Sequence, residues 1–334
     1  MRLSLLNSVR TIEDEKDNIL AAMDIAFEMK DWMNVVWIMG AINFDGVNGL
    51  LTVRGYWDEA IRRTEQALKA ARILKYETTI GGLAHNVAAT YQMRGELTAA
   101  RRHYDESLEI RRKLGDQSGI GDTLHQLATL AQDQGDFARA QRLYDESLEI
   151  KRKLGDQSGI ASTLHNLAVI AQDQGDLAQA RRLYDESLEI AGKLDDQNGI
   201  AITLHQLGGL AQIQGDMLEA RRLYDESLKI ARKLGNQSGI TLTLHQLGML
   251  AQNQGELAEA RRLYGESLEI EKKLGNQSGI AITLHQLAML AEVEGNKSEA
   301  ARLFREALSI FEKLGSPNAN VARRSLERVE GESS

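Results

Sequence analysis

The sequence predicts an all-α protein in which helix–turn–helix repeats stack into a solenoid. The segment GDQSGI begins at Gly115 and returns, with small changes, every 40 residues as far as position 275. Within each repeat, apolar residues recur at the spacing of a helix face. Proline occurs once, at Pro317, against 29 glycines. Glycine rather than proline is therefore expected to end the helices and form the turns.

The first half of each repeat is expected to form one amphipathic helix of about 15 residues. In the repeat that begins at residue 115, a single apolar stripe falls at i, i+4, i+7, i+8 and i+11: Ile120, Leu124, Leu127, Ala128 and Ala131. The polar residues 133–136 then interrupt the stripe. They are expected to form the turn of a hairpin.

A second helix, of about 18 residues, is expected after this turn. Its apolar stripe consists of Ala140, Leu143, Tyr144, Ser147, Leu148 and Ile150. Gly155 suits the left-handed position that ends a helix, and Ser158 is expected to cap the helix that follows. Because one hairpin cannot bury its own stripes, the hairpins are expected to stack on one another.

The repeat divides the chain into three parts. Residues 1–34 are expected to form an N-terminal helical cap or a degenerate repeat. Residues 35–314 hold seven repeats of 40 residues, marked by a ladder of glycines from Gly55 to Gly295. Residues 315–334 are expected to form a C-terminal capping helix, which starts at Ser316-Pro317, and a short tail.

The repeats resemble the tetratricopeptide repeat (TPR). The resemblance rests on the pair Leu127-Ala128, the turn glycine Gly135, then Ala140, Tyr144 and the pair Ser147-Leu148. It implies a right-handed superhelical solenoid. The period is longer than the family's usual length of about 34 residues, and the family's closing proline is absent. In these departures the chain is similar to the longer-period subclass of kinesin light chains and Pins-type adaptors.

The N-terminal part carries a second resemblance. Residues 15–32, together with Arg54-Gly-Tyr-Trp57, resemble the start of the helical repeats behind the nucleotide-binding module of STAND-type ATPases. That resemblance implies the sensor end of a larger switch, or a stand-alone relative of one. A simple capping pair of helices is the alternative.

Composition limits the partners and the compartment. The chain has 40 Lys and Arg against 48 Asp and Glu, a net charge of −8, so nucleic acid is not an expected partner. It has no cysteine, which excludes disulfides and thiolate zinc sites. The sequence shows no secretory signal and no apolar run near the roughly 18 residues that a membrane span needs. We therefore expect a cytoplasmic protein without membrane contact.

Catalytic residues, metals and cofactors are not expected. The motifs GxxxxGK[ST], HExxH and GxSxG are absent. Six histidines recur at one position of successive repeats: His85, His125, His165, His205, His245 and His285. Stacked helices lie about 10 Å apart, whereas the ligands of one metal ion lie about 2 Å from it. Six equivalent copies therefore indicate a repeated structural role.

The TPR resemblance implies that the polar face of each first helix lines a concave groove, which holds extended peptides or partner helices. On this face a histidine precedes a glutamine or asparagine, whose carboxamide can donate to and accept from a bound backbone. The predicted groove residues are Asn86, His125, Gln126, His165, Asn166, Ile202, His205, Gln206, Leu242, His245, Gln246, Met249, Ile282, His285, Gln286 and Met289.

Neighbouring positions of this face become apolar toward the C-terminus. One column runs Asp122, Ser162, Ile202, Leu242 and Ile282. A groove that is polar at one end and apolar at the other would suit a peptide or helix with an apolar anchor, and methionine adds adaptability. Drift after duplication is one alternative, and packing of these side chains between adjacent hairpins is another.

These observations predict a non-catalytic scaffold that binds a protein or peptide in the groove. The first alternative is the ligand-sensing region of a STAND-type ATPase, in which a partner domain performs the chemistry. The second alternative is a self-associating structural protein, since near-identical hairpins expose similar surfaces.

Overall fold

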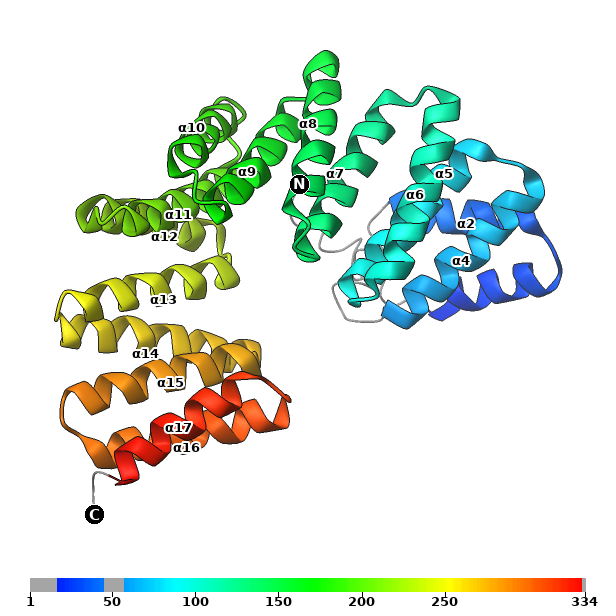
Figure 1. The fold of residues 1–334 in the computed structure, drawn as a ribbon. Coiled ribbons are helices and arrows are strands. Elements are labelled where there is room, and N and C mark those ends of the chain that lie inside the picture. Colours follow the sequence, from blue (N-terminus) through cyan, green and yellow to red (C-terminus); the bar gives the residue numbers. More distant parts are fainter. Residues whose placement is uncertain (1–16, 45–56, 332–334) are drawn as a thin grey trace. The chain divides into compact units, whose positions relative to one another are not determined.

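The computed structural model describes residues 17–44 and 57–331 (Figure 1). Within these ranges the secondary structure is helical, and the predicted all-α repeat fold is confirmed. Residues 1–16, 45–56 and 332–334 lie outside the described residues. They include most of the predicted C-terminal tail and residues 54–56 of the N-terminal motif, among them Gly55, the first glycine of the ladder.

Six complete hairpins follow one another in the described part of the chain. Their first helices are α5 (Glu77–Met93), α7 (Gln117–Asp133), α9 (Gln157–Asp173), α11 (Gln197–Ile213), α13 (Gln237–Asn253) and α15 (Gln277–Val293). Their second helices are α6 (Leu97–Leu114), α8 (Phe137–Leu154), α10 (Leu177–Lys193), α12 (Met217–Leu234), α14 (Leu257–Leu274) and α16 (Lys297–Lys313).

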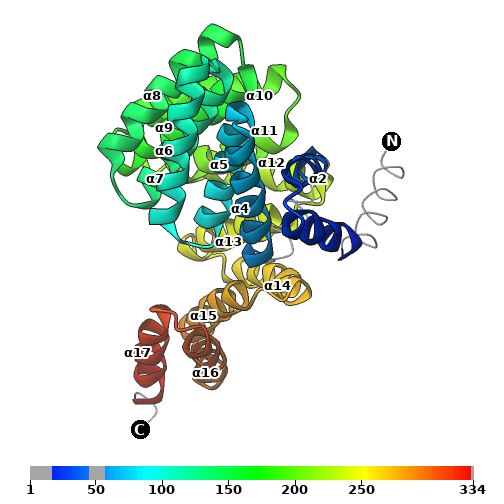
Figure 2. The ribbon, with the colours of Figure 1, turned by 90° about the vertical axis from the view of Figure 1, so that its right-hand side faces the viewer.

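Further helices lie at both ends of this array. A helix over residues 17–28 precedes α2 (Trp32–Phe44) and α4 (Trp57–Leu74), and α17 (Asn318–Gly331) follows α16. Residues 1–170 and 171–334 form two compact units, and each is described by itself. Within each unit successive helices pack in chain order, as α14 to α17 show (Figures 1 and 2).

The helix ends confirm one prediction and correct another. Gly155 ends α8 in the left-handed conformation, with φ of 71°, as its position predicts. Ser158 does not cap the next helix, because it lies inside α9. Asp156 is the cap instead: its Oδ1 accepts a hydrogen bond of 2.9 Å from the backbone N–H of Gly159. The chain enters the next helix directly after the glycine, so the acceptor must stand one residue beyond it.

Each hairpin is held together around one aromatic side chain of its second helix. Tyr144 and its equivalents in the other hairpins are at most 1% exposed. The two helices are also joined by a hydrogen bond, which Ser147 Oγ donates to the backbone carbonyl of Gly121 over 2.7 Å. The predicted apolar stripes are therefore core, and the small residues between them allow the helices to approach closely.

The last helix of the described residues is α17. It packs against α16 and buries Ala322, Ser325 and Val329. Arg328 donates two hydrogen bonds of 2.8 Å to the Glu292 carboxylate on α15. None of the helices in the described ranges combines the length and the apolar composition that crossing a membrane requires.

Candidate ligand-binding groove

The predicted groove residues lie on one face of the first helices. The histidines and their glutamine or asparagine neighbours are half-buried in every hairpin, and so are Met249 and Met289. The apolar members are more open: Ile202 is 45%, Leu242 54% and Ile282 36% exposed. These three side chains are therefore at the surface and not packed away between hairpins.

Five of the histidines contact the aromatic ring of their own hairpin: His85, His125, His205, His245 and His285. The rings of His125 and Tyr144 have centroids 5.1 Å apart and cross at 69°, an edge-to-face contact. His85 repeats this arrangement with Tyr104, and His285 repeats it with Phe304. The histidine is thus a packing residue on the outer edge of the hairpin core.

In three hairpins the histidine also forms a hydrogen bond to a threonine of the next hairpin. Nδ1 of His125 lies 3.1 Å from Thr163 Oγ1, and the His85–Thr123 and His205–Thr243 pairs match at 3.3 and 3.2 Å. Thr163 has a single hydroxyl proton, which it donates to the carbonyl of Gly159. His125 must therefore donate through Nδ1, which leaves Nε2 as an acceptor.

Burial fixes the charge state of these histidines. It lowers the pKa of His85, His125 and His205 to about 4, because the charged ring would lose its hydration. Burial also lowers the pKa of His165, His245 and His285. The histidine column is therefore neutral at pH 7. No cluster of metal-ligating side chains occurs among the described residues.

The last histidine differs from the others. The residue 38 positions after His285 is Arg323, which pairs with Glu312 on α16, so no threonine is present to accept from the ring. In the described structure, Nε2 of His285 is buried without a hydrogen-bond partner.

The carboxamides on this face are open to a ligand. The side-chain carboxamides of Gln206, Gln246 and Gln286 make no hydrogen bond to any group in the described part of the chain, and all three residues are half-buried. Asn166 differs, because its Nδ2 lies 3.3 Å from His125 Nε2. Three glutamines within residues 171–334 can therefore bind an added backbone without breaking an internal contact.

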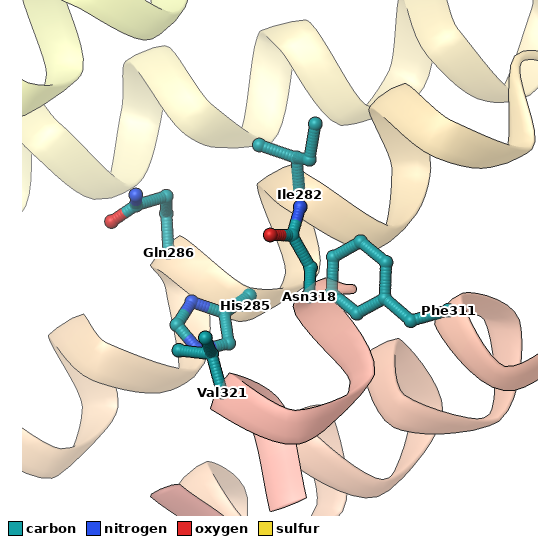
Figure 3. Close-up of a pocket in the computed structure, with 6 residues that line it drawn as sticks. All are labelled: Ile282, His285, Gln286, Phe311, Asn318 and Val321. Carbon is teal, nitrogen blue, oxygen red and sulfur yellow. The ribbon is translucent and has the colours of Figure 1, made fainter. Parts of the chain in front are cut away.

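Two cavities open on this face within residues 171–334. The first, the α11–α13 cavity, has a volume of 80 Å³, and Ile202, Gln206, Ala231 and Leu242 are among its lining residues. The second, the α15–α17 cavity, has a volume of 180 Å³ and is shown in Figure 3. Its lining residues are Ile282, His285, Gln286, Phe311, Asn318 and Val321. Sequence reasoning named Ile202, His205, Gln206 and Leu242 in the first cavity and Ile282, His285 and Gln286 in the second, but not Ala201, Gly239 and Thr243.

The sequence as a whole now allows a family assignment. The tetratricopeptide repeat profile matches residues 79–153, 159–235 and 239–313, which is more than half of the chain. The chain belongs to the tetratricopeptide repeat family. No protein of curated function matches the sequence significantly.

Solved structures that share the TPR fold include three that are informative. A STAND protein with a tetratricopeptide repeat sensor from Pyrococcus horikoshii is 15% identical, with a TM-score of 0.69 over 99% of this chain and 49% of that one. BtubC from P. vanneervenii is 21% identical, with a TM-score of 0.58 over 66% of this chain and 92% of that one. A Rap protein in complex with competence and sporulation factor is 13% identical, with a TM-score of 0.58 over 94% and 98%. At these identities the likeness shows the fold.

One set of groove residues was missed by sequence reasoning. It lies near the end of the second helix of each TPR hairpin, where one position points toward the start of the next hairpin. We call this set the filler column: Arg111, Lys151, Ala191, Ala231, Glu271 and Phe311. Ala231 and Phe311 line the two cavities. Comparing the second helices with one another, as was done for the first helices, would have revealed the column.

The filler column also carries charge in the first unit. Arg111 Nη1 donates to the Gly119 carbonyl over 2.7 Å, and Lys151 Nζ lies 3.4 Å from Asp122 Oδ1. In residues 171–334 the corresponding first-helix residues are Ile202, Leu242 and Ile282. This first-helix position is thus charged and internally paired at Asp122 in the first unit and apolar in residues 171–334, where Glu271 is the one charged member of the filler column.

Proposed function

We propose that this TPR chain is a non-catalytic scaffold, which binds a protein or peptide segment along the first helices of residues 171–334. One observation carries the proposal. Exposed aliphatic side chains at Ile202, Leu242 and Ile282 alternate along the face with the unengaged carboxamides of Gln206, Gln246 and Gln286.

This combination suits a peptide for physical reasons. Exposed aliphatic side chains in a row are unfavourably hydrated, and covering them with an apolar surface releases free energy. A carboxamide donates and accepts at once, so it can pair with a peptide group whatever the side chain of the ligand. The face therefore offers backbone binding and apolar contact together, and it favours an uncharged, apolar segment.

Two relatives by fold support this reading. The Rap protein structure contains competence and sporulation factor, and the Pyrococcus horikoshii protein is described as having a tetratricopeptide repeat sensor. Both align with nearly the whole of this chain. A face that recognises another molecule is thus compatible with this arrangement of hairpins.

The experiment compares two substitutions of the same kind on one unit. Full-length protein and the variants Leu242→Asp and Leu218→Asp serve as baits in extract of the native host, and captured proteins are quantified by mass spectrometry. Leu218 is an exposed leucine, 82% accessible, at the start of the second helix α12 and outside the groove. We expect Leu242→Asp to lose the captured partner and Leu218→Asp to retain it. Equal capture by both variants would contradict the proposal.

A second candidate is the sensor region of a STAND-type ATPase. It is favoured by the alignment in which 99% of this chain covers 49% of the Pyrococcus horikoshii STAND protein. In that case the chain would be part of a longer polypeptide in its host. An immunoblot of native extract distinguishes the two: a single band near 37.1 kDa rejects the sensor region, and a much larger band supports it.

A further inference from the structure

The size of the side chain in the filler column sets how much space is left beside the glycine that begins the next hairpin. Five of its side chains lie beside the glycine in the first turn of the next hairpin: Arg111, Lys151, Ala191, Ala231 and Glu271. A methyl group added to Gly119 would meet Arg111 Cδ at 2.7 Å, and one added to Gly159 would meet Lys151 Cδ at 2.7 Å. The same space is therefore occupied by a long side chain at both of these junctions.

Two junctions in residues 171–334 differ in whether a long side chain fills this space. A methyl group on Gly279 would meet Glu271 Cδ at 2.5 Å, so the glutamate fills the space between α13 and α15. Between α11 and α13 the residue is Ala231, whose Cβ is 3.5 Å from a methyl group on Gly239. The α11–α13 cavity is thus the space that the missing side chain would occupy.

Apart from the Gln206 carboxamide, the polar side chains that line this cavity already take part in hydrogen bonds. Ser227 donates to the Ala201 carbonyl over 2.7 Å, and Thr243 donates to the Gly239 carbonyl over 2.8 Å. Asn236 Oδ1 accepts from the Gly239 N–H over 3.0 Å. Its lining residues include no Asp, Glu, Lys or Arg. Besides the Gln206 carboxamide, what remains open is aliphatic surface, which favours an uncharged and apolar group.

We propose that the α11–α13 cavity is an anchor pocket that accepts one aliphatic side chain, of leucine, isoleucine or methionine size, from a bound peptide. This inference rests on the proposed function. The volume of 80 Å³ is several times the roughly 10–15 Å³ that a cavity needs to hold one water, which leaves room for a branched aliphatic group. Ile202 and Leu242 flank the opening, and Gln206 stands beside it to hold the peptide backbone.

The chain itself supplies the variant that closes the pocket. Ala231→Glu reproduces the Glu271 junction, in which four surrounding residues are identical and Ala201 is replaced by Thr241. The identical pairs are Ser227 and Ser267, Asn236 and Asn276, Gly239 and Gly279, and Thr243 and Thr283. The fold therefore already accommodates glutamate in this environment. Ala231→Met closes the pocket without burying a charge, and it decides the matter should Ala231→Glu fail to fold by circular dichroism.

The probe is a display library of random dodecapeptides selected on the full chain. We expect enriched peptides with an aliphatic residue at one fixed position. A synthetic copy should bind Ala231→Glu and Ala231→Met at least tenfold more weakly than the parent, since burying one such side chain is worth about that factor. Replacing the aliphatic residue of the peptide by alanine should weaken binding to the parent but not to Ala231→Glu.

The outcomes separate the two proposals. The double variant Gln246→Ala/Gln286→Ala tests the groove without touching residues that line the α11–α13 cavity. A peptide that loses affinity for this variant but binds Ala231→Glu and Ala231→Met like the parent overturns the anchor pocket and leaves the groove. Enrichment no greater than on an empty support, or full binding by the glutamine variant, overturns the proposed function as well.

Discussion

Nδ1 of His125 lies 3.1 Å from Oγ1 of Thr163, so a side-chain hydrogen bond joins the first helices of two successive hairpins. The threonine hydroxyl proton is donated to the Gly159 carbonyl, and the imidazole is therefore the donor in this pair. The sequence predicts that these histidines lie on the groove face and that their repetition reflects a structural role. The structure identifies that reason as the connection between hairpins.

The first prediction concerns this hydrogen bond. Thr163→Val leaves the Nδ1–H of His125 half-buried without an acceptor, which should lower the free energy of unfolding by about 1–2 kcal/mol. Urea unfolding of the full chain measures the effect. Thr241→Val is the matched control, because the Thr241 hydroxyl is bonded only within its own helix, to the Ser238 carbonyl. The interpretation fails if both variants unfold at the same urea concentration.

The second prediction is a loss of stability at mildly acidic pH. Burial lowers the pKa of His85, His125 and His205 to about 4, from an unfolded value near 6.5. Between these values the unfolded chain binds protons that the folded chain does not. The stabilisation is therefore complete above about pH 6.5 and is lost as pH falls toward 4.

Urea midpoints measured between pH 7.5 and 4.5 test this prediction. A triple variant with phenylalanine at His85, His125 and His205 should show a flatter profile over that window. Paired carboxylates whose pKa is lowered, such as Asp24, lose their stabilisation only below about pH 4 and are separated from the histidine effect. Parallel profiles for the parent and the triple variant would refute the assignment.

Much of the fold could be predicted from the sequence because the repeats of this one chain can be compared with one another. Seven copies of one hairpin separate the constant stripe, which is core, from the variable face, which is surface. The filler column was not predicted from the sequence, because Arg111, Lys151 and Glu271 lie among other charged residues near a helix end. Periodicity alone cannot distinguish an exposed lysine from Lys151, which is 5% exposed because the next hairpin covers it.

The third prediction concerns the attachment of the helix over residues 17–28. Arg63 is 3% exposed and pairs with Asp24 on that helix, with Nη2 to Oδ2 at 2.7 Å, and also with Glu59. Removing a buried partner is costly because the remaining charge is left uncompensated. Asp24 is partly exposed, so Arg63→Met should cost about 1–2 kcal/mol.

Hydrogen exchange followed by mass spectrometry reads out this attachment locally. Amides of residues 17–28 should exchange about tenfold faster in Arg63→Met, since 1.4 kcal/mol corresponds to a tenfold change in the opening equilibrium. Arg62→Met is the control: Arg62 also reaches Asp24, at 3.5 Å, but its side chain is 51% exposed. Faster exchange of equal size in both variants would show that the buried pair is not the anchor.

The last prediction tests why a glycine lies in the first turn of the first helix in five of the hairpins, from α7 to α15. A methyl group on Gly159 would overlap the carboxylate of its cap, Asp156, and would lie 2.7 Å from Lys151 Cδ. A methyl group on Gly239 would lie 3.1 Å from Asn236 Nδ2 and 3.5 Å from Ala231 Cβ. Gly159→Ala should therefore lose about 1–2 kcal/mol through the disturbed cap and the overpacking. Gly239→Ala should be near neutral, because better helix propensity offsets a small shift of Asn236.

Urea midpoints of the two variants measure the difference, and Lys151→Ala should restore part of the loss in Gly159→Ala. Equal midpoints would mean that the filler side chain does not require the glycine.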